Sequence, residues 1–283
     1  MIRLDAATVL LQWSVGGLFF LWVTTRHREV GLGYGWLMRA TFLVLALGAV
    51  AAGTAFHPLA LRDAAAVGVA VAAGVALVVS VVRRRAGVAG QHEHTERREA
   101  RVAAMTGIDR AATTRDPEAA EFPPWLDLVA PAIGVVGLAA AAVDAGDPAL
   151  ALLRTFVGAL FLGAVTDAML LGHWYLVQPG MSRTPLLEQV RWLTVIWPLE
   201  VIALLLPTGM LSVLNGTIAD GYNGLLGWFW VACAVATIVL CVATRAALRE
   251  RYYSAVMAAT GLLYLAILTA FGTDLVARIL LSP

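Results

Sequence analysis

The stretch ALALLRTFVGALFLGAVTDAMLLGHWYL, residues 149–176, decides the fold, because it is a long apolar run that contains only two fully charged side chains, Arg154 and Asp167. An α-helix rises about 1.5 Å per residue, so about twenty apolar residues cross the hydrocarbon core of a bilayer. The stretch is long enough to do this, and Pro179 and Gly180 after it are typical of a helix end. It therefore predicts a transmembrane helix.

The rest of the chain repeats this apolar pattern. Hydrophobic residues make up 60% of the 283 residues and charged residues 14%, which excludes an ordinary soluble domain. We expect an all-α, polytopic integral membrane protein whose first partner is the lipid bilayer. About eight transmembrane helices are predicted, at residues 5–25, 34–56, 64–82, 125–143, 149–176, 186–207, 223–244 and 252–277.

Predicted loops that are rich in arginine alternate along the chain with loops that contain one arginine or none. Loops rich in arginine or lysine stay in the cytoplasm, and this chain contains no lysine. Both termini are therefore predicted to face outward from a bacterial inner membrane. The arginines that set this orientation are Arg26, Arg28, Arg83, Arg84, Arg85, Arg183, Arg245, Arg249 and Arg251.

An internal duplication is predicted from two of the helices. LLQWSVGGLFFLWVTT (residues 10–25) and LLRTFVGALFLGAVTD (residues 152–167) align without a gap and agree at about half of their positions. The predicted organisation is two parallel four-helix halves. The first half comprises three helices in residues 1–82 and a fourth in 125–148; a cytoplasmic polar loop, 83–124, interrupts it, and residues 149–283 form the second half.

Charged side chains inside the predicted spans need partners. A charge in hydrocarbon costs at least about 2.5–3.5 kcal/mol, so each is expected to pair or to face a wet cavity. Arg154 and Glu200 fall at one depth, which predicts a pair between them.

A second charged cluster is predicted nearer the cytoplasm. Asp167 lies at a depth similar to those of Arg39 and Arg191, one from each half, so either is a candidate partner. We take Asp167, Arg191, Arg39 and His173 as the candidate catalytic residues.

His173 is the conspicuous residue near the end of the opening stretch. It lies six residues from Asp167, about 240° around a helix, so the two cannot line one face. Trp174 and Tyr175 beside it are typical of an interfacial aromatic belt, which is the simpler interpretation; a proton relay to Asp167 is the alternative.

Several chemistries lack the residues they require. His57 and His173 fall at opposite membrane faces, which argues against a haem held by two histidines. Cys233 and Cys241 lie within one apolar run and form no metal-ligand spacing, so no metal site is predicted. The formal net charge of +1 gives no reason to expect a nucleic-acid partner.

Three functions remain open. The first is a quinone-interacting or respiratory-type membrane subunit without its own haem, working with other membrane subunits and with Asp167 as a protonatable group. The second is a small-solute or proton-coupled transporter that uses the same residues. The third is a non-catalytic scaffold or assembly subunit, in which the buried charges only register the helices. Two four-helix halves are similar to the architecture of quinol-reacting anchors of the polysulfide-reductase type, which implies the first function by analogy alone.

Overall fold

The structure, a computed structural model, describes residues 5–90, 92–93, 96–97, 120–145, 147–178 and 181–282. These residues form long α-helices joined by turns, and no strand occurs among them. The elements in chain order are α1 (Ala6–Thr25), α2 (Leu32–Phe56), α3 (Ala60–Val82), η1 (Arg83–Ala86), η2 (Pro124–Leu128), α5 (Val129–Asp144), α6 (Pro148–Val177), α7 (Thr184–Leu205), α8 (Gly209–Leu214), α9 (Leu225–Arg249) and α10 (Tyr253–Leu281).

Seven helices in the described ranges are long and apolar enough to cross a membrane: α1, α2, α3 with η1, α5 with η2, α6, α9 and α10. They indicate a multi-pass protein in a lipid bilayer. α7 is about 33 Å long and also reaches the required length. It is not among the seven because it carries Glu188, Arg191 and Glu200. A helix thus lies in each of the eight predicted ranges, while eight crossings remain a prediction.

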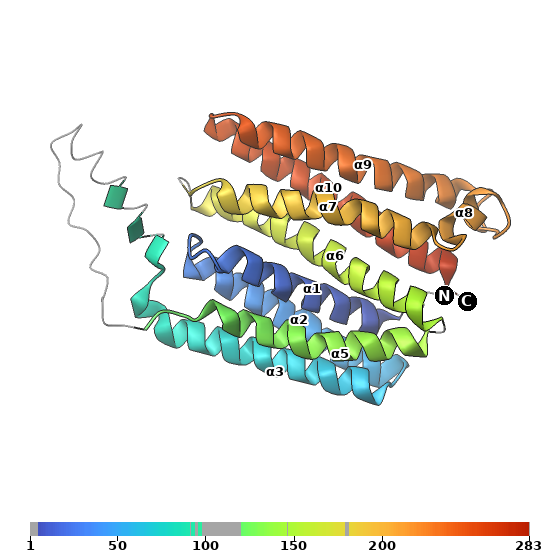
Figure 1. Ribbon diagram of the computed structural model, residues 1–283, viewed down its shortest axis with the longest axis horizontal. Coiled ribbons are helices and arrows are strands. Elements are labelled where there is room, and N and C mark those ends of the chain that lie inside the picture. Colours follow the sequence, from blue (N-terminus) through green and yellow to red (C-terminus); the bar gives the residue numbers. More distant parts are fainter. Residues whose placement is uncertain are drawn as a thin grey trace.

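The long helices form two groups of four (Figure 1). In the first group α1 packs against α2 and α5, and α3 packs against the same two helices. In the second group α6 and α9 both pack against α7 and α10. The groups meet mainly where α1 lies along α6, with α5 also touching α6. This arrangement is compatible with two halves, and their origin by duplication remains a prediction.

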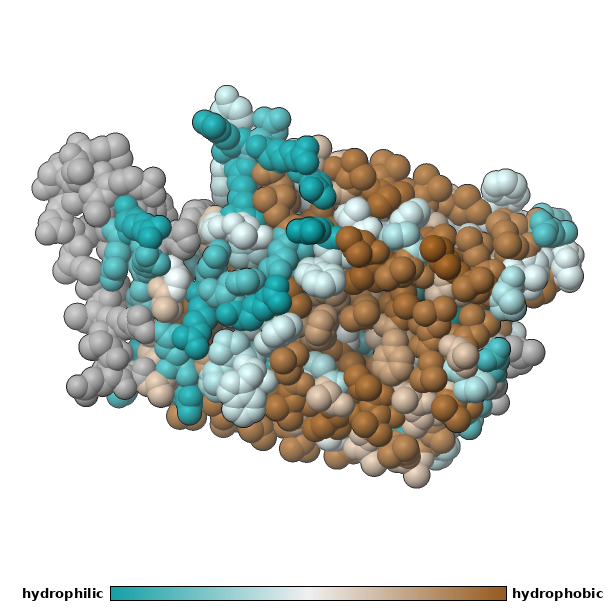
Figure 2. Space-filling model, viewed as in Figure 1, coloured by the Kyte–Doolittle hydropathy of each residue, from teal (hydrophilic) through white to brown (hydrophobic). Residues whose placement is uncertain are grey.

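The two ends of the bundle differ in charge. We call the end that carries the α1–α2, α6–α7 and α9–α10 turns the arginine-rich end. The opposite end, where α1 begins and α10 finishes, is the terminal end (Figure 1). Figure 2 shows hydrophilic residues gathered toward the arginine-rich end and hydrophobic residues over the middle of the bundle. This distribution is what a bilayer around the helices requires.

Arg183, just before α7, ties the arginine-rich end together. Its guanidinium donates to the backbone carbonyls of Leu248 (3.1 Å), Arg251 and Tyr252 (3.0 Å each), and also to that of Glu250. The last carbonyls of a helix have no partner within the helix and carry partial negative charge. Arg183 therefore closes the end of α9 and fixes the α9–α10 turn.

Glycines bring the backbones of α1 and α6 into direct contact. A Cβ atom on Gly16 would lie 1.8 Å from the carbonyl oxygen of Ala159, and one on Gly163 would lie 2.2 Å from the carbonyl carbon of Gly16. Small residues permit this close packing, on which helix association in membranes depends. The two groups of helices are thus joined by a contact that needs glycine at both positions, because any side chain there would push α1 and α6 apart.

The predicted polar loop, residues 83–124, falls largely outside the described residues, which include 83–90, 92–93, 96–97 and 120–124 of it. The described parts contact the turn between α1 and α2. Arg28 pairs with Glu121 at 3.1 Å, and the carbonyl of Arg28 accepts from the amide of Gly90 at 3.0 Å. Arg83 donates to the carbonyl of Glu121 at 2.9 Å.

Candidate functional site

Asp167 lies in α6 at the contact between the two groups of helices, and its side chain is fully buried. Thr24 Oγ1 donates to Asp167 Oδ2 at 2.8 Å, and Gln189 Nε2 donates to the same oxygen at 3.1 Å. The hydroxyl of Tyr34 donates to the backbone carbonyl of Asp167 at 3.4 Å. The other carboxyl oxygen, Oδ1, has no hydrogen-bond partner in the described part of the chain. Helices α1, α2 and α7 therefore surround an acidic group that they satisfy on one oxygen only.

The two arginines predicted to partner Asp167 lie elsewhere, and that prediction is wrong. Arg39 pairs with Asp127. Arg191 is exposed on α7, on the same face as the exposed Val195 and Leu199, whereas Asp167 is inside the bundle. The donors that the described structure gives the Asp167 carboxyl group are the neutral Thr24 and Gln189. Asp167 thus receives neutral donors where a cation was expected.

The actual partner of Arg39 is a carboxylate at the start of the fourth long helix. Arg39 Nε and Nη2 donate to Asp127 Oδ1 and Oδ2 at 2.7 and 2.8 Å, a two-bond pair, and Nη1 donates to Ser80 at 3.2 Å. The Arg39 guanidinium lies 4.1 Å from the ring centre of Phe122, which adds a cation–π contact. Both side chains of the ion pair are almost completely buried. This pair joins α2 to the region where the chain re-enters the bundle.

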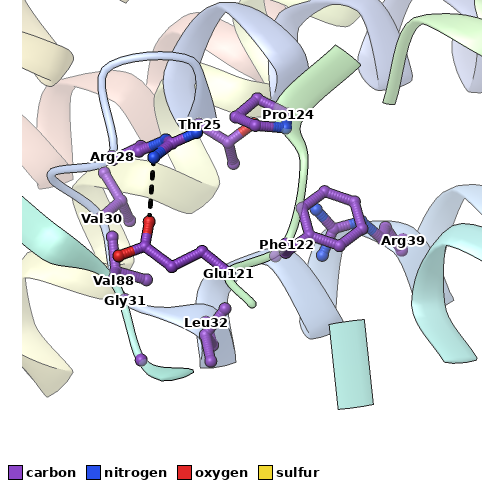
Figure 3. A pocket seen from close by; sticks show the side chains of 12 residues that line it. Thr25, Arg28, Val30, Gly31, Leu32, Arg39, Val88, Glu121, Phe122 and Pro124 are labelled. Carbon is purple, nitrogen blue, oxygen red and sulfur yellow. Dashed lines mark hydrogen bonds and ion pairs between the residues drawn. The ribbon is translucent and has the colours of Figure 1, made fainter. Parts of the chain in front are cut away.

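A small cavity lies beside this pair at the arginine-rich end (Figure 3). Its volume is about 30 Å³, which is large enough to admit water. Figure 3 shows the Arg28–Glu121 ion pair on one side and the Phe122 ring beside Arg39 on the other. Polar and apolar side chains therefore share the lining. The full lining is Thr25, Arg28, Val30, Gly31, Leu32, Gly35, Arg39, Gly87, Val88, Glu121, Phe122 and Pro124.

Thr25 connects the cavity with the Asp167 cluster. It lines the cavity and donates to Asp127 Oδ2 at 3.1 Å. The residue before it, Thr24, donates to Asp167. The last turn of α1 therefore contacts both buried carboxyl groups, the paired Asp127 and the unpaired Asp167. This part of the bundle is the candidate functional site.

His173 takes no part in the Asp167 cluster. It is exposed on α6, and its Nδ1 lies 3.0 Å from the hydroxyl of Tyr264 on α10. The aromatic residues after it point in different directions, because Trp174 donates to Gln178 at 3.0 Å whereas Tyr175 is buried and donates to the carbonyl of Ser182. The separation of His173 from Asp167 agrees with the predicted helical faces. Its catalytic role remains untested.

Arg154 and Glu200, the pair predicted from their depth, form no hydrogen bond with each other. Arg154 donates to the backbone carbonyls of Ala203 (3.0 Å) and Leu206 (2.5 Å) near the end of α7. Both carboxyl oxygens of Glu200 lack a hydrogen-bond partner among the described residues. Arg154 nevertheless binds α7 within one turn of Glu200, at Ala203.

Two residues that the sequence analysis missed complete these clusters. Asp127 was overlooked, although it is a carboxylate at the edge of an apolar span. Gln189 was overlooked because it is neutral, yet it holds Asp167 and also donates to the backbone carbonyl of Phe20 at 3.1 Å. A search for uncharged amides beside membrane acids would have found Gln189.

Searches of protein-family models, curated proteins and solved structures found no match to this chain. The geometry of the buried residues therefore carries the functional argument.

Proposed function

We propose that this chain is a proton-binding membrane protein in which Asp167 takes up and releases the proton. The observation that carries the proposal is the fully buried carboxyl group with one oxygen, Oδ1, lacking a donor in the described structure. A negative charge in such a place is costly, and protonation of the free oxygen removes that charge. Thr24 and Gln189 fix the orientation of the carboxyl group through its other oxygen, Oδ2.

The arginine-rich end is the proposed entry side for the proton. The cavity beside Arg39 has room for water, and Thr25 in its lining adjoins the residue that contacts Asp167. Small movements of water and of the Thr24 hydroxyl would connect the two in this proposal. The Arg39–Asp127 pair keeps the surroundings of the cavity polar.

Two kinds of membrane protein would use a proton bound at Asp167. Reduction of a quinone to a quinol takes up two protons and two electrons. We therefore propose a quinone-interacting, respiratory-type subunit as the first form of the function, with quinone as the ligand and other membrane subunits as the partners that supply the electrons. A proton-coupled transporter is the second form. It is favoured by the position of Asp167 between the two groups of helices, where substrate sites of two-half transporters lie.

Replacing Asp167 with asparagine tests the site directly. The infrared pH-difference spectrum of the purified protein is expected to contain a carboxyl protonation signal that disappears in Asp167→Asn. Quinone reduction, or proton uptake into vesicles, is expected to fall about 10²–10⁴-fold, the range for loss of a proton-transferring group. Lipid extraction of the wild-type protein separates the two forms, because only the first predicts bound quinone.

Asp220→Asn is the matched control. Asp220 accepts from the backbone amides of Tyr222 (2.9 Å) and Gly224 (2.8 Å) before α9, far along the chain from the site. It is expected to leave both the signal and the turnover unchanged. An Asp167→Asn protein with the wild-type spectrum and only reduced thermal stability would contradict the proposal and support the scaffold function.

We also propose that all eight long helices cross a bacterial inner membrane with both termini outside. α1 begins and α10 ends at the same end of the bundle, which an even number of crossings requires (Figure 1). A reporter enzyme active only in the cytoplasm is expected to be active when fused after Arg85 and inactive when fused after Leu281. The reverse pattern would contradict this orientation. Reporters fused before and after α7 test whether α7 crosses the membrane, because a crossing gives activity at one of these fusions and none at the other.

A further inference from the structure

A second group of buried charges lies in the terminal half of the second helix group. Glu200 of α7 and Asp274 of α10 are 1% and 0% exposed, and Arg154 and Arg278 are 3% and 1% exposed. Asp274 is enclosed although it lies near the end of α10. The four side chains come from three helices and interact electrostatically.

The arginines of this group direct their hydrogen bonds away from Glu200. Arg278 Nε and Nη2 donate to the two carboxyl oxygens of Asp274 at 2.6 and 2.8 Å. Arg154 donates to backbone carbonyls at the end of α7. Glu200 is thus left, in the described structure, with two buried oxygens and no donor, beside the Asp274 carboxylate. Electrostatic attraction from the arginines remains, but no hydrogen bond holds a charged Glu200.

Helices α1, α8 and α9 add an acceptor and no charge near this group, while Asp147, just before α6, acts electrostatically on Arg154. α1 contains no charged residue. Its Gln12 is fully buried, and the Oε1 atom of Gln12 has no hydrogen-bond partner within the described ranges. A Cβ on Gly158 would lie 2.8 Å from Arg278 Nη2 and 3.4 Å from Gln12 Nε2. The absence of a side chain at Gly158 therefore lets these two side chains pack directly against α6. α8 contains no charged residue, and the arginines of α9 lie at its other end, at Arg245 and Arg249.

We propose that Glu200 is a second proton-binding group, next to Asp274, Arg278 and Arg154 and separate from Asp167. A proton satisfies the observations better than a metal cation does. Two fixed guanidinium groups repel a cation, and Arg278 already occupies both oxygens of Asp274. A protonated Glu200 is neutral and can donate a hydrogen bond, and the group contains acceptors in Gln12 Oε1 and the Asp274 carboxylate.

Glu200→Gln is the variant that tests the second site. Glutamine has the shape of a protonated glutamate, so the fold is expected to persist. Infrared pH-difference spectra of the wild-type protein should contain two buried-carboxyl signals, one lost in Glu200→Gln and the other in Asp167→Asn. Glu250→Gln, at an exposed position in the α9–α10 turn, is the control and should lose neither.

Labelling of the wild-type protein supplies a second readout that needs no variant. A hydrophobic carbodiimide adds to protonated carboxyl groups in apolar surroundings, and mass spectrometry is expected to find it on the peptide that contains Glu200. The proposal is overturned if Asp167→Asn removes every buried-carboxyl signal, or if Glu200→Gln removes none. The first of these results leaves Asp167 as a proton site, so the two proposals fail independently.

Discussion

Replacing Arg39 with alanine is expected to lower the free energy of unfolding by about 3–5 kcal/mol, the range for breaking a buried ion pair by removing one partner. The loss is large because Asp127, whose side chain is 0% exposed, would lose the two guanidinium bonds that now satisfy its carboxyl group. The contact of Arg39 with the Phe122 ring would be lost as well. Unfolding of the detergent-purified protein with increasing denaturant measures the change.

Two further variants distinguish the cost of an unpaired charge from a general loss of packing. The double replacement Arg39→Met with Asp127→Leu removes both charges, so it should recover most of the stability lost by either single change. Arg28→Ala breaks an ion pair whose arginine is half exposed and should cost at most about 1 kcal/mol. A double variant no more stable than Arg39→Ala would show that the charge of Asp127 is not the cause.

Replacing Gly16 with alanine is expected to destabilise the protein by about 1–3 kcal/mol or more, through overpacking of the α1–α6 contact. The new methyl group would lie 1.8 Å from the Ala159 carbonyl oxygen, and a backbone atom cannot move aside as a side chain can. The helices must separate, which also weakens the contact of Thr24 with Asp167. The thermal unfolding midpoint measures the effect.

Gly261→Ala in α10 is the matched control because a Cβ there meets nothing within 4 Å. Alanine is favoured over glycine inside a helix by about 0.5–1 kcal/mol, so this variant is expected to be as stable as the wild type or more so. Equal destabilisation by both replacements would contradict the role of the α1–α6 contact.

The sequence was sufficient to predict the helices but not their buried partners. Length and apolarity place a helix in every predicted range, because both are properties of a segment. Partners depend on which side of a helix faces inward, and a membrane helix is apolar on all sides, so its periodicity does not reveal that side. Gln189 and Arg191 illustrate the difficulty. They are two residues and about 200° apart on α7, and the neutral residue is the one that faces Asp167.

The predicted pairs failed for a related reason. Depth placed Arg154 near Glu200 correctly, but an arginine has several donors and also binds free backbone carbonyls, here those near the end of α7. The Asp274–Arg278 pair was accessible from sequence, because a carboxylate four residues before an arginine lies on the same helical face.

The length of α6 determines how the two acidic sites affect each other. Asp167 belongs to this helix and Arg154, beside Glu200, lies thirteen residues earlier, so about 20 Å of continuous helix separates the two levels. Two charges at that distance interact by about 0.8 kcal/mol at an effective dielectric constant of about 20. No single hydrogen bond spans such a gap. Each carboxyl group should therefore bind its proton almost independently of the other. In a variant that lacks one of them, the infrared signal of the other serves as an internal reference in the same molecule.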